Sequence, residues 1–217
     1  MLVSDAVAAR KSIRAFLEKP VSDETIKTLL AKAARAPSGG NVQPWRIYVL
    51  NGKSMQSFKQ YVTAQTEPEE GAYEIYPRNL PDPYRSSRFK VGEDMYALLN
   101  IPREDRSARI RRLMENYQFF GAPASIFCFV DRCMGPPQWS DLGMFLQTFM
   151  LLAQEEGLAT CAQEAWSARP KTVADFVGAP DEQMIFCGVA VGYEDTAAAV
   201  NSLVSEREAL GEFVTFV

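Results

Sequence analysis

The apolar positions of this chain alternate between helical and strand patterns along its length. Residues 23–36 repeat apolar side chains at helical spacing after Ser22, a good capping residue, and predict a helix that stops at Pro37. Two uninterrupted apolar runs, ASIFCFVD at 124–131 and MIFCGVAVGY at 184–193, predict buried strands. RIYVL at 46–50 predicts another strand, and LATCAQEAW at 158–166 predicts a short extended segment that leads into a helix.

The other periodic segments complete an α+β pattern. Ser4 predicts the cap of a first helix that ends near Ala9, and further helices are predicted at about 55–63, 95–100, 107–120, 140–157 and 171–178. The helix at 140–157 is expected to be capped at its start and to stop at Gly157. EFVTFV at 212–217 has strand composition but no adjacent hairpin partner, so it must pair elsewhere, for example with another subunit. The result is helices packed on a mixed, mainly antiparallel sheet.

Residues 64–90 follow neither pattern. They contain four prolines, three tyrosines and many charges without a clear period. A long irregular stretch inside a compact chain is usually a lid or a disordered insertion, and the aromatic content favours a lid. We therefore expect a single domain over residues 1–217, with a lid or insert region at about 64–120.

Composition narrows the classes of protein. With 217 residues and 47% apolar content the chain can fill a substantial core, but its longest apolar window, at 144–153, is interrupted by Gln147 and Thr148. That window falls short of the roughly 20 residues a bilayer requires. The N-terminus has no secretory signal, so a cytoplasmic protein without membrane contact is expected. The formal charge of −4, without a basic block, argues against nucleic-acid binding.

The chain contains no histidine, which restricts its chemistry. Ser-His-Asp and Cys-His triads are excluded, and so is the commonest nitrogen ligand of zinc. The four cysteines lack CxxC spacing, and three lie in apolar strand-like contexts that are typical of small core side chains. Unless the chain has an unusual all-carboxylate metal site, difficult chemistry must come from a bound organic cofactor.

Three short segments have side chains suited to ligand binding. APSGGNVQPW at 36–45 contains two carboxamides, Asn41 and Gln43, beyond what a turn needs, although they could instead cap neighbouring backbone groups. RKSIR at 10–14 places Arg10, Ser12 and Arg14 on one side of an extended segment, where they could bind a phosphate or form a solvated basic patch. Glu164 in CAQEAW is a candidate too, or an exposed loop carboxylate.

Nucleotide-binding motifs are absent. GKS at 52–54 lacks the glycine that a P-loop places five positions earlier, where this chain has Ile47, and is interpreted as a turn. No GxGxxG occurs, since Gly188 and Gly192 lie inside a strand pattern. Clusters such as REDRSARIRR at 103–112 are mixed in sign and fit a solvated helix face.

Taken in order, these segments resemble the nitroreductase-like family of FMN-dependent oxidoreductases. The matching features are Arg-x-Ser-x-Arg, Ala-Pro-Ser-x-x-Asn-x-Gln-Pro-Trp before a strand, a helix with Asp-x-Gly at 141–143, a Gly-Leu segment ending near Glu164, a Gly-x-x-x-Gly strand and a C-terminal Arg before an apolar strand. The resemblance spans nearly the whole chain. It implies a homodimer with FMN held by both subunits at the interface, and a C-terminal strand exchanged between them.

The resemblance also implies site residues. Arg10, Ser12 and Arg207 would hold the phosphate and ribityl end of FMN, and Arg14 would lie near the pyrimidine edge, where a guanidinium stabilises the reduced flavin. Backbone N–H groups at 163–165 would face N5 and O4, and the 37–43 loop would approach from the other subunit. The complete cofactor-binding set comprises Arg10, Lys11, Ser12, Arg14, Pro37, Ser38, Gly39, Asn41, Gln43, Gln163, Glu164, Ala165 and Arg207.

The implied activity is NAD(P)H-dependent reduction of nitroaromatics or quinones by ping-pong hydride transfer. Arg78, Arg85 and Arg88 in the lid region would favour an aromatic carboxylate such as nitrobenzoate. One departure concerns the C-terminal phosphate contact, where many members have Lys-x-Arg and this chain has Ser205, Glu206 and Arg207. Alternatives are another reaction on the same fold, such as ene reduction or reductive dehalogenation, or a non-catalytic flavin-binding protein. The acceptor, the choice of NADH or NADPH, the extent of nitro reduction and the role of 64–90 are left open.

Overall fold

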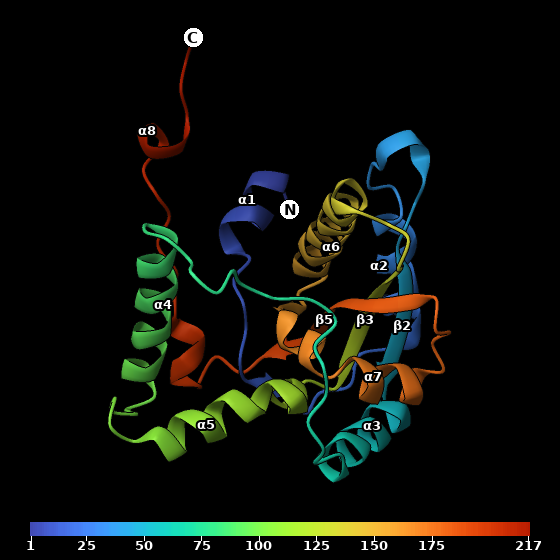
Figure 1. Ribbon diagram of the computed structural model, residues 1–217, viewed down its shortest axis with the longest axis horizontal. Coiled ribbons are helices and arrows are strands. Elements are labelled where there is room, and N and C mark those ends of the chain that lie inside the picture. The colour runs from blue at the N-terminus through green and yellow to red at the C-terminus, as the bar shows by residue number, and fades with distance from the viewer.

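One antiparallel sheet lies at the centre of the computed structural model, which describes residues 1–217 (Figure 1). Its strands are β1 (Phe16–Leu17), β2 (Arg46–Asn51), β3 (Ala124–Asp131), β4 (Ala159–Gln163) and β5 (Gln183–Glu194). The order is β1-β5-β3-β2, and β4 also pairs with β5, next to the short β1 pairing. All these pairs are antiparallel, and the parallel component is a single bridge between Ser12 and Thr160.

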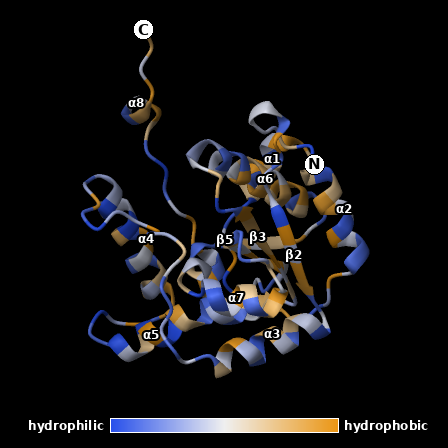
Figure 2. Ribbon diagram, turned by 45° about the vertical axis from the view of Figure 1, so that its right-hand side comes forward, coloured by the Kyte–Doolittle hydropathy of each residue, from blue (hydrophilic) through white to orange (hydrophobic).

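Helices cover both faces of the sheet. On one face lie α2 (Asp23–Ala33) and the long α6 (Pro136–Glu155), with α1 (Val3–Ala9) packed on α6. On the other lie α3 (Lys53–Ala64) and α7 (Pro170–Val177). The two layers explain why β3 and β5 are apolar without alternation, since neither face of these strands meets water. Figure 2 shows apolar strands between helices whose polar sides face outward.

The long helix α6 departs from its prediction at the start. It begins at Pro136, after Gly135, rather than with a cap near Ser140. Proline is favoured in the first turn because its missing N–H would have no helical partner there. The Ser140 hydroxyl therefore lies inside the helix and donates to the carbonyl of Pro137 at 2.6 Å. The helix ends at Glu155, and Gly157, the predicted stop, follows it with a positive φ of 69°.

Two helices stand apart from the sheet, α4 (Tyr84–Leu98) and α5 (Arg106–Met114) (Figure 1). Neither contains a buried residue. Helix α4 begins at Tyr84, so the second part of the stretch predicted to be irregular is helical. The sequence missed it because a helix without a buried face has no apolar period to recognise.

The irregular segment before α4 is fixed to the protein at its first half. Glu69 accepts hydrogen bonds from the backbone N–H groups of Lys171 and Thr172 at the start of α7, at 2.8 and 3.0 Å. The Arg169 guanidinium donates to the carbonyls of Gln65 and Glu67, at 2.7 and 2.8 Å. A backbone bond from Ala72 to Ser167 at 2.7 Å continues this attachment. Residues 65–72 therefore lie against α7 and the segment that precedes it.

The C-terminal segment has no strand partner within its own chain. Residues 212–217 form no strand within the chain: Leu210–Phe213 is a short helix, α8, and the last four residues extend away from the body (Figure 1). Phe213 and Phe216 are 66% and 90% exposed. The partner predicted for this segment is another subunit, which a single chain does not contain. The remaining short helices are of 3-10 type: η1 (Gly39–Asn41), η2 (Glu115–Gly121), η3 (Glu164–Ala168) and η4 (Ala199–Ser202).

Candidate functional site

The Arg10–Arg14 segment is extended and anchored to the sheet. The backbone N–H of Ile13 donates to the carbonyl of Thr160 in β4 at 3.0 Å, and the Ile13 side chain is 2% exposed in the core. Buried Asn201 in η4 accepts from the N–H of Arg14 at 2.8 Å and donates to the carbonyl of Ala15 at 2.8 Å. These contacts fix the backbone, so the side chains of Arg10, Ser12 and Arg14 project from a defined position.

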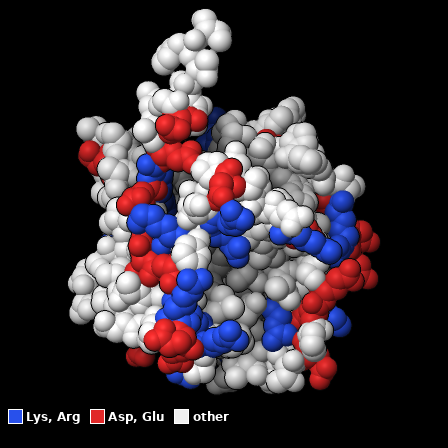
Figure 3. Space-filling model, turned by 60° about the vertical axis from the view of Figure 1, so that its left-hand side comes forward, with Lys and Arg blue, Asp and Glu red and all other residues white.

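A cleft of about 650 Å³ lies beside this segment. Its lining includes Arg10, Lys11, Ser12 and Arg14 from the N-terminal part and Leu203, Val204, Ser205 and Arg207 from the C-terminal part, with Gln147 from α6. Figure 3 shows Lys and Arg side chains gathered around a hollow on this side of the molecule, with acidic side chains around them. The structure therefore brings together five of the predicted site residues from opposite ends of the chain.

The cations of this cleft differ in their partners. Lys11 forms an ion pair with Glu194 at 2.9 Å and donates to the carbonyl of Asn201 at 2.6 Å. The Arg207 guanidinium donates to the carbonyl and hydroxyl of Ser205, at 3.0 and 2.7 Å. Arg14 donates to the carbonyl of Ser12 at 3.3 Å and forms no ion pair, and Arg10 has no side-chain partner within the chain. Arg10 is thus the cation most available to an external anion.

The segment 163–165 lies at the end of β4, where η3 begins. Gln163 is buried, and its amide donates to the carbonyl of Asn116 at 2.7 Å, so this side chain supports the loop from inside. Trp166 is fully buried against Phe119 and Phe127, with ring centroids 4.7 and 5.2 Å away. The first N–H groups of a helical turn have no partner within it, so the start of η3 offers backbone donors held on a rigid base.

Glu164 is the one ionisable side chain of this segment. The residue is exposed at the surface, yet neighbouring protein removes enough water from its carboxyl group to raise its pKa. No hydrogen bond or ion pair to another side chain compensates for the lost hydration within the chain. Glu164 is therefore not the fully solvated loop carboxylate that the sequence left as an alternative.

The 37–43 loop lies apart from this cleft within one chain. Its turn is held by the N–H of Gly39, which donates to the buried Asp141 carboxylate at 3.3 Å, and by the Ser38 hydroxyl, which accepts from the N–H of Gln43 at 3.0 Å. Asn41 and Gln43 have positive φ angles of 58° and 52°, and their side chains are exposed. None of Pro37, Ser38, Gly39, Asn41 and Gln43 lines the cleft that contains Arg10.

Sequence reasoning missed three residues of this region. Asn201, which holds the Arg14 backbone, lies in AAVNSL without any signal of a buried amide. The sequence analysis used Gln147 only as a break in an apolar window, although it lines the cleft. A single amide in an otherwise apolar helix was the signal that could have identified it as a site residue. Arg112 belongs to a cluster expected to be solvated, but it is half-buried and its guanidinium donates to the carbonyl of Arg14 at 3.0 Å.

Most of the sequence matches the model of one known protein family. The model of the Nitroreductase family matches residues 7–193, which include β1 to β4, β5 except its last residue, and the Arg10–Arg14 segment. The chain belongs to the nitroreductase family. Among its relatives, the 4-nitrobenzoate reductase of Pseudomonas putida is 37% identical over 212 residues, 97% of this chain and 93% of that protein. The nitrobenzene nitroreductase of Ectopseudomonas oleovorans is 33% identical over 99% of this chain and 96% of its own.

Solved structures of this nitroreductase family agree with the fold. The FMN and NADPH-dependent nitroreductase NfnB from Sphigopyxis sp. strain HMH superimposes with a TM-score of 0.95 at 42% identity, covering 100% of this chain and 99% of that one. The FMN-dependent NfnB from Mycobacterium smegmatis, solved in complex with NADPH, gives 0.92 at 28% identity over 99% and 98% of the two chains. The α+β fold with its antiparallel sheet is therefore confirmed, and so is the predicted family. No helix of the chain is long and apolar enough to cross a membrane.

Proposed function

We propose that this chain is an FMN-dependent NAD(P)H nitroreductase. The observation that supports this most directly is the cleft of about 650 Å³ at which Arg10, Ser12 and Arg207 meet from opposite ends of the chain. An unpaired guanidinium, a hydroxyl and a second guanidinium form a donor set that suits a phosphate. The cleft is within the size range of cofactor sites, about 300–1,000 Å³. The donors present therefore fit FMN.

Each residue has a defined part in holding FMN. Arg10 and Ser12 would hold the phosphate of FMN, Arg207 would assist if its bonds to Ser205 rearranged, and Arg14 would contribute positive charge to the flavin ring. Lys11 is engaged by Glu194 and Asn201, so it fixes the segment rather than binding the phosphate directly. In this assignment the departure from Lys-x-Arg at 205–207 increases the dependence on Arg10.

Catalysis needs little from side chains in this proposal. When bound, FMN supplies two-electron transfer between the nicotinamide donor and the acceptor. Arg14 contributes a fixed positive charge beside the ring edge where negative charge develops on reduction. Gln163, Glu164 and Ala165 contribute backbone donors whose position is set by buried Trp166, which orders the ring for transfer. No histidine is required for either role.

A homodimer completes the site in this proposal. The 37–43 loop has exposed carboxamides and does not reach the cleft of its own chain, so it is available to the cofactor of a partner. The tail from Ala209 to Val217 exposes Leu210, Phe213 and Phe216 to solvent, an apolar surface that a partner subunit can cover. The exchanged C-terminal strand remains part of this proposal, together with a single domain over 1–217 and a cytoplasmic location.

Relatives guide the choice of acceptor. The names of the two relatives described above specify 4-nitrobenzoate and nitrobenzene, so a single-ring nitroaromatic is the proposed acceptor, and the NfnB structures point to NADPH as the donor. The 64–120 region, with α4 and α5 beside the cleft, is proposed as the lid that selects it. Val91 and Arg88 of α4 lie close enough to line the adjoining cavities.

Anaerobic titration tests the reaction. The purified protein is expected to retain FMN, to lose its flavin absorbance when NADPH is added, and to recover it when nitrobenzene is added. Bleaching without reoxidation by nitroaromatics, but with reoxidation by an enone or a halogenated acceptor, would favour another reaction of the fold. A flavin that NADPH and NADH both fail to bleach would favour a non-catalytic flavin-binding protein.

Sedimentation tests the dimer. We expect the full chain to sediment as a dimer and a chain ending at Glu208 to be largely monomeric and to lose most of its FMN, because both the apolar tail and the shared site depend on the partner. Phe216→Ser is the milder variant, expected to weaken association without removing the backbone. A truncated chain that remains a dimer with full FMN content would contradict the exchanged tail.

A further inference from the structure

A second, smaller cavity of about 230 Å³ adjoins the proposed cofactor cleft. It lies between α4, α5, η2 and the Arg10–Arg14 segment, and Arg14, Val91 and Leu203 line both spaces. Three guanidinium groups, those of Arg14, Arg88 and Arg112, border it, and no acidic residue does. The rest of its lining is mostly apolar and aromatic, including Met95, Tyr96 and Phe120.

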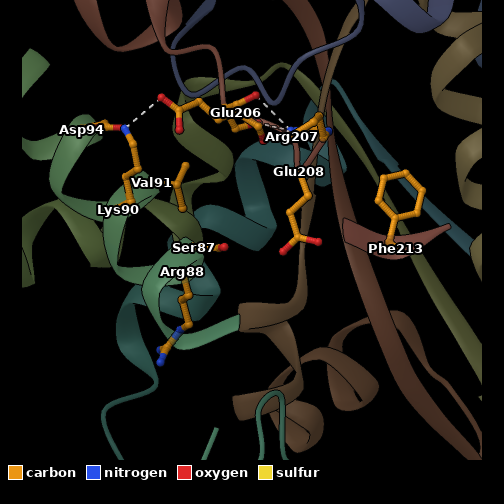
Figure 4. A pocket seen from close by; sticks show the side chains of 10 residues that line it. Ser87, Arg88, Lys90, Val91, Asp94, Glu206, Arg207, Glu208 and Phe213 are labelled. Carbon is orange, nitrogen blue, oxygen red and sulfur yellow. Dashed lines mark hydrogen bonds and ion pairs between the residues drawn. The ribbon is translucent and has the colours of Figure 1, made fainter. Parts of the chain in front are cut away.

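These three arginines have no carboxylate partners. None of the ion pairs in the chain includes Arg14, Arg88 or Arg112. The neighbouring cavity of about 890 Å³ is different, because Lys90 there pairs with Asp94 at 2.8 Å and with Glu206 at 3.2 Å (Figure 4). No carboxylate borders the smaller cavity, whereas Asp94, Glu206 and Glu208 border its neighbour.

Arg112 is the most constrained of the three. Its Nη2 donates to the carbonyl of Arg14 at 3.0 Å, and its guanidinium lies 5.1 Å from the centre of the Phe120 ring. Its Nε is buried without any hydrogen-bond partner. Burial lowers the pKa of Arg112 and nearby Arg14 lowers it further, while Glu115 opposes this from a distance without an ion pair. An arginine stays charged even so, and a buried charge with an unmet donor is costly unless an anion joins it.

We propose that this cavity binds the carboxylate of a single-ring aromatic acid, with Arg112 as the principal anchor and Arg14 and Arg88 as its neighbours. Guanidinium groups bind carboxylates through paired hydrogen bonds, and the aromatic and apolar lining suits a benzene ring. A volume of about 230 Å³ lies below the usual range for larger ligands and suits a single aromatic ring. The assignment deepens the proposed function, on which it rests, because it makes a nitrobenzoate the preferred acceptor.

The assignment also changes which arginines select the acceptor. The sequence suggested Arg78, Arg85 and Arg88. Arg78 pairs with Glu74 at 3.0 Å, and Arg85 pairs with Asp82 at 2.5 Å, so both are neutralised at the surface. Only Arg88 of that set lines the cavity, where its guanidinium lies 4.2 Å from the centre of the Tyr76 ring.

Calorimetric titration with benzoate, which has no nitro group to reduce, tests the site independently of catalysis. We expect the FMN-loaded wild type to bind benzoate at least 10-fold more tightly than benzamide, and Arg112→Met to lose that preference. Arg112→Lys should restore part of it. Arg111→Met, one position away but exposed and outside the cavity, is the matched control and should bind benzoate like the wild type.

Steady-state kinetics provide the second arm. In Arg112→Met the kcat/KM for 4-nitrobenzoate should fall at least 10-fold further than that for nitrobenzene, and the difference between the two substrates should lie in KM. Equal binding of benzoate and benzamide by the wild type, or full benzoate affinity in folded Arg112→Met, would overturn the site. If inorganic phosphate competed with benzoate as strongly as unlabelled benzoate does, the cavity would recognise only the anion, and the proposed binding of the aromatic ring would be overturned. A wild type that binds benzoate but reduces no nitroaromatic would contradict the proposed function and leave the site intact.

Discussion

The two sides of the site are built in opposite ways. The cofactor side rests on the sheet, where Ile13, Phe127 and Trp166 are 2% exposed or less. The proposed acceptor side consists of α4 and α5, which contain no buried residue and are held partly by ion pairs such as Glu93 with Arg109 at 2.6 Å. Partly exposed ion pairs contribute about 0–1 kcal/mol each, far less than buried aromatic rings. The comparison indicates a fixed cofactor geometry beside a region that can change to suit the acceptor.

The largest expected effect comes from adding one methyl group to the packed sheet on the cofactor side. At Gly188 in β5 a Cβ would lie 2.3 Å from Cδ1 of Trp166, and 3.2 Å from Cε1 of Phe127. Gly188→Ala should therefore lower the free energy of unfolding by about 1–3 kcal/mol. Because Trp166 supports residues 163–165, FMN retention should fall as well. Thermal unfolding and the flavin content after gel filtration measure the two effects.

Gly92→Ala in α4 is the counterpart on the acceptor side. A Cβ there has no heavy atom within 4 Å, and alanine is the better helix former by about 0.5–1 kcal/mol. The variant should unfold at the same temperature as the wild type or slightly above it, with normal FMN content. If Gly92→Ala proved as destabilising as Gly188→Ala, the two sides would be packed alike and the comparison would fail.

The next largest effect is on FMN affinity, and it compares a cation without a partner with a cation held in ion pairs. Arg10 on the cofactor side has no side-chain partner, whereas Lys90 on α4 is paired with Asp94 and Glu206. Arg10→Gln should weaken FMN binding by about 10–100-fold, since a hydrogen bond between charged groups contributes about 1.5–3 kcal/mol. Lys90→Gln should change it by less than about 3-fold. Titration of the apoprotein with FMN, followed by flavin fluorescence, measures both; equal losses would remove Arg10 from the phosphate site.

The same contrast explains what the sequence could predict. The strand ASIFCFVD was assigned at 124–131, the bounds of β3, because burial on both faces leaves an unbroken apolar run. The cap of α2 was also predicted, and the Ser22 hydroxyl accepts from the N–H of Thr25 at 3.0 Å. On the acceptor side the method failed: α4 has no buried face, so its start was missed.

The candidate site was only partly predictable. The resemblance to a family suggested Arg10, Ser12, Arg14 and Arg207 together, and the structure places them on one cleft, although their roles remain proposals. Residue spacing alone could not bring positions 10 and 207 together, because their approach depends on the folded sheet. Arg112 was missed for a related reason: in RIRRL three arginines look alike, and only the folded structure shows that Arg109 pairs with Glu93, Arg111 is exposed and Arg112 packs against Phe120.

The smallest expected effect is on the stability of the apoprotein, which the charges of Glu164 and Glu93 should change in opposite directions. Loss of hydration raises the pKa of Glu164, so its charged form destabilises the folded chain above that pKa. On α4, hydrogen bonds from Arg109 lower the pKa of Glu93, so its charged form stabilises the fold. At pH 7 Glu164→Gln should raise the melting temperature of the apoprotein, and Glu93→Gln should lower it. Both shifts should be small, because water screens the charges of partly exposed carboxylates.

The direction of each pH dependence follows from protonation. As the pH falls through the raised pKa of Glu164 toward the ordinary glutamate value of 4.5, the wild-type carboxyl becomes neutral and the advantage of Glu164→Gln disappears. The stabilisation from Glu93 is present above 4.5 and is lost as the pH falls through its lowered value, so the deficit of Glu93→Gln also shrinks, but over a lower range. Melting curves of the apoprotein from pH 7 down to 3 measure both. If both variants changed the melting temperature in the same direction, the two carboxylates would have similar surroundings. The sheet side would then exclude water no better than α4 does.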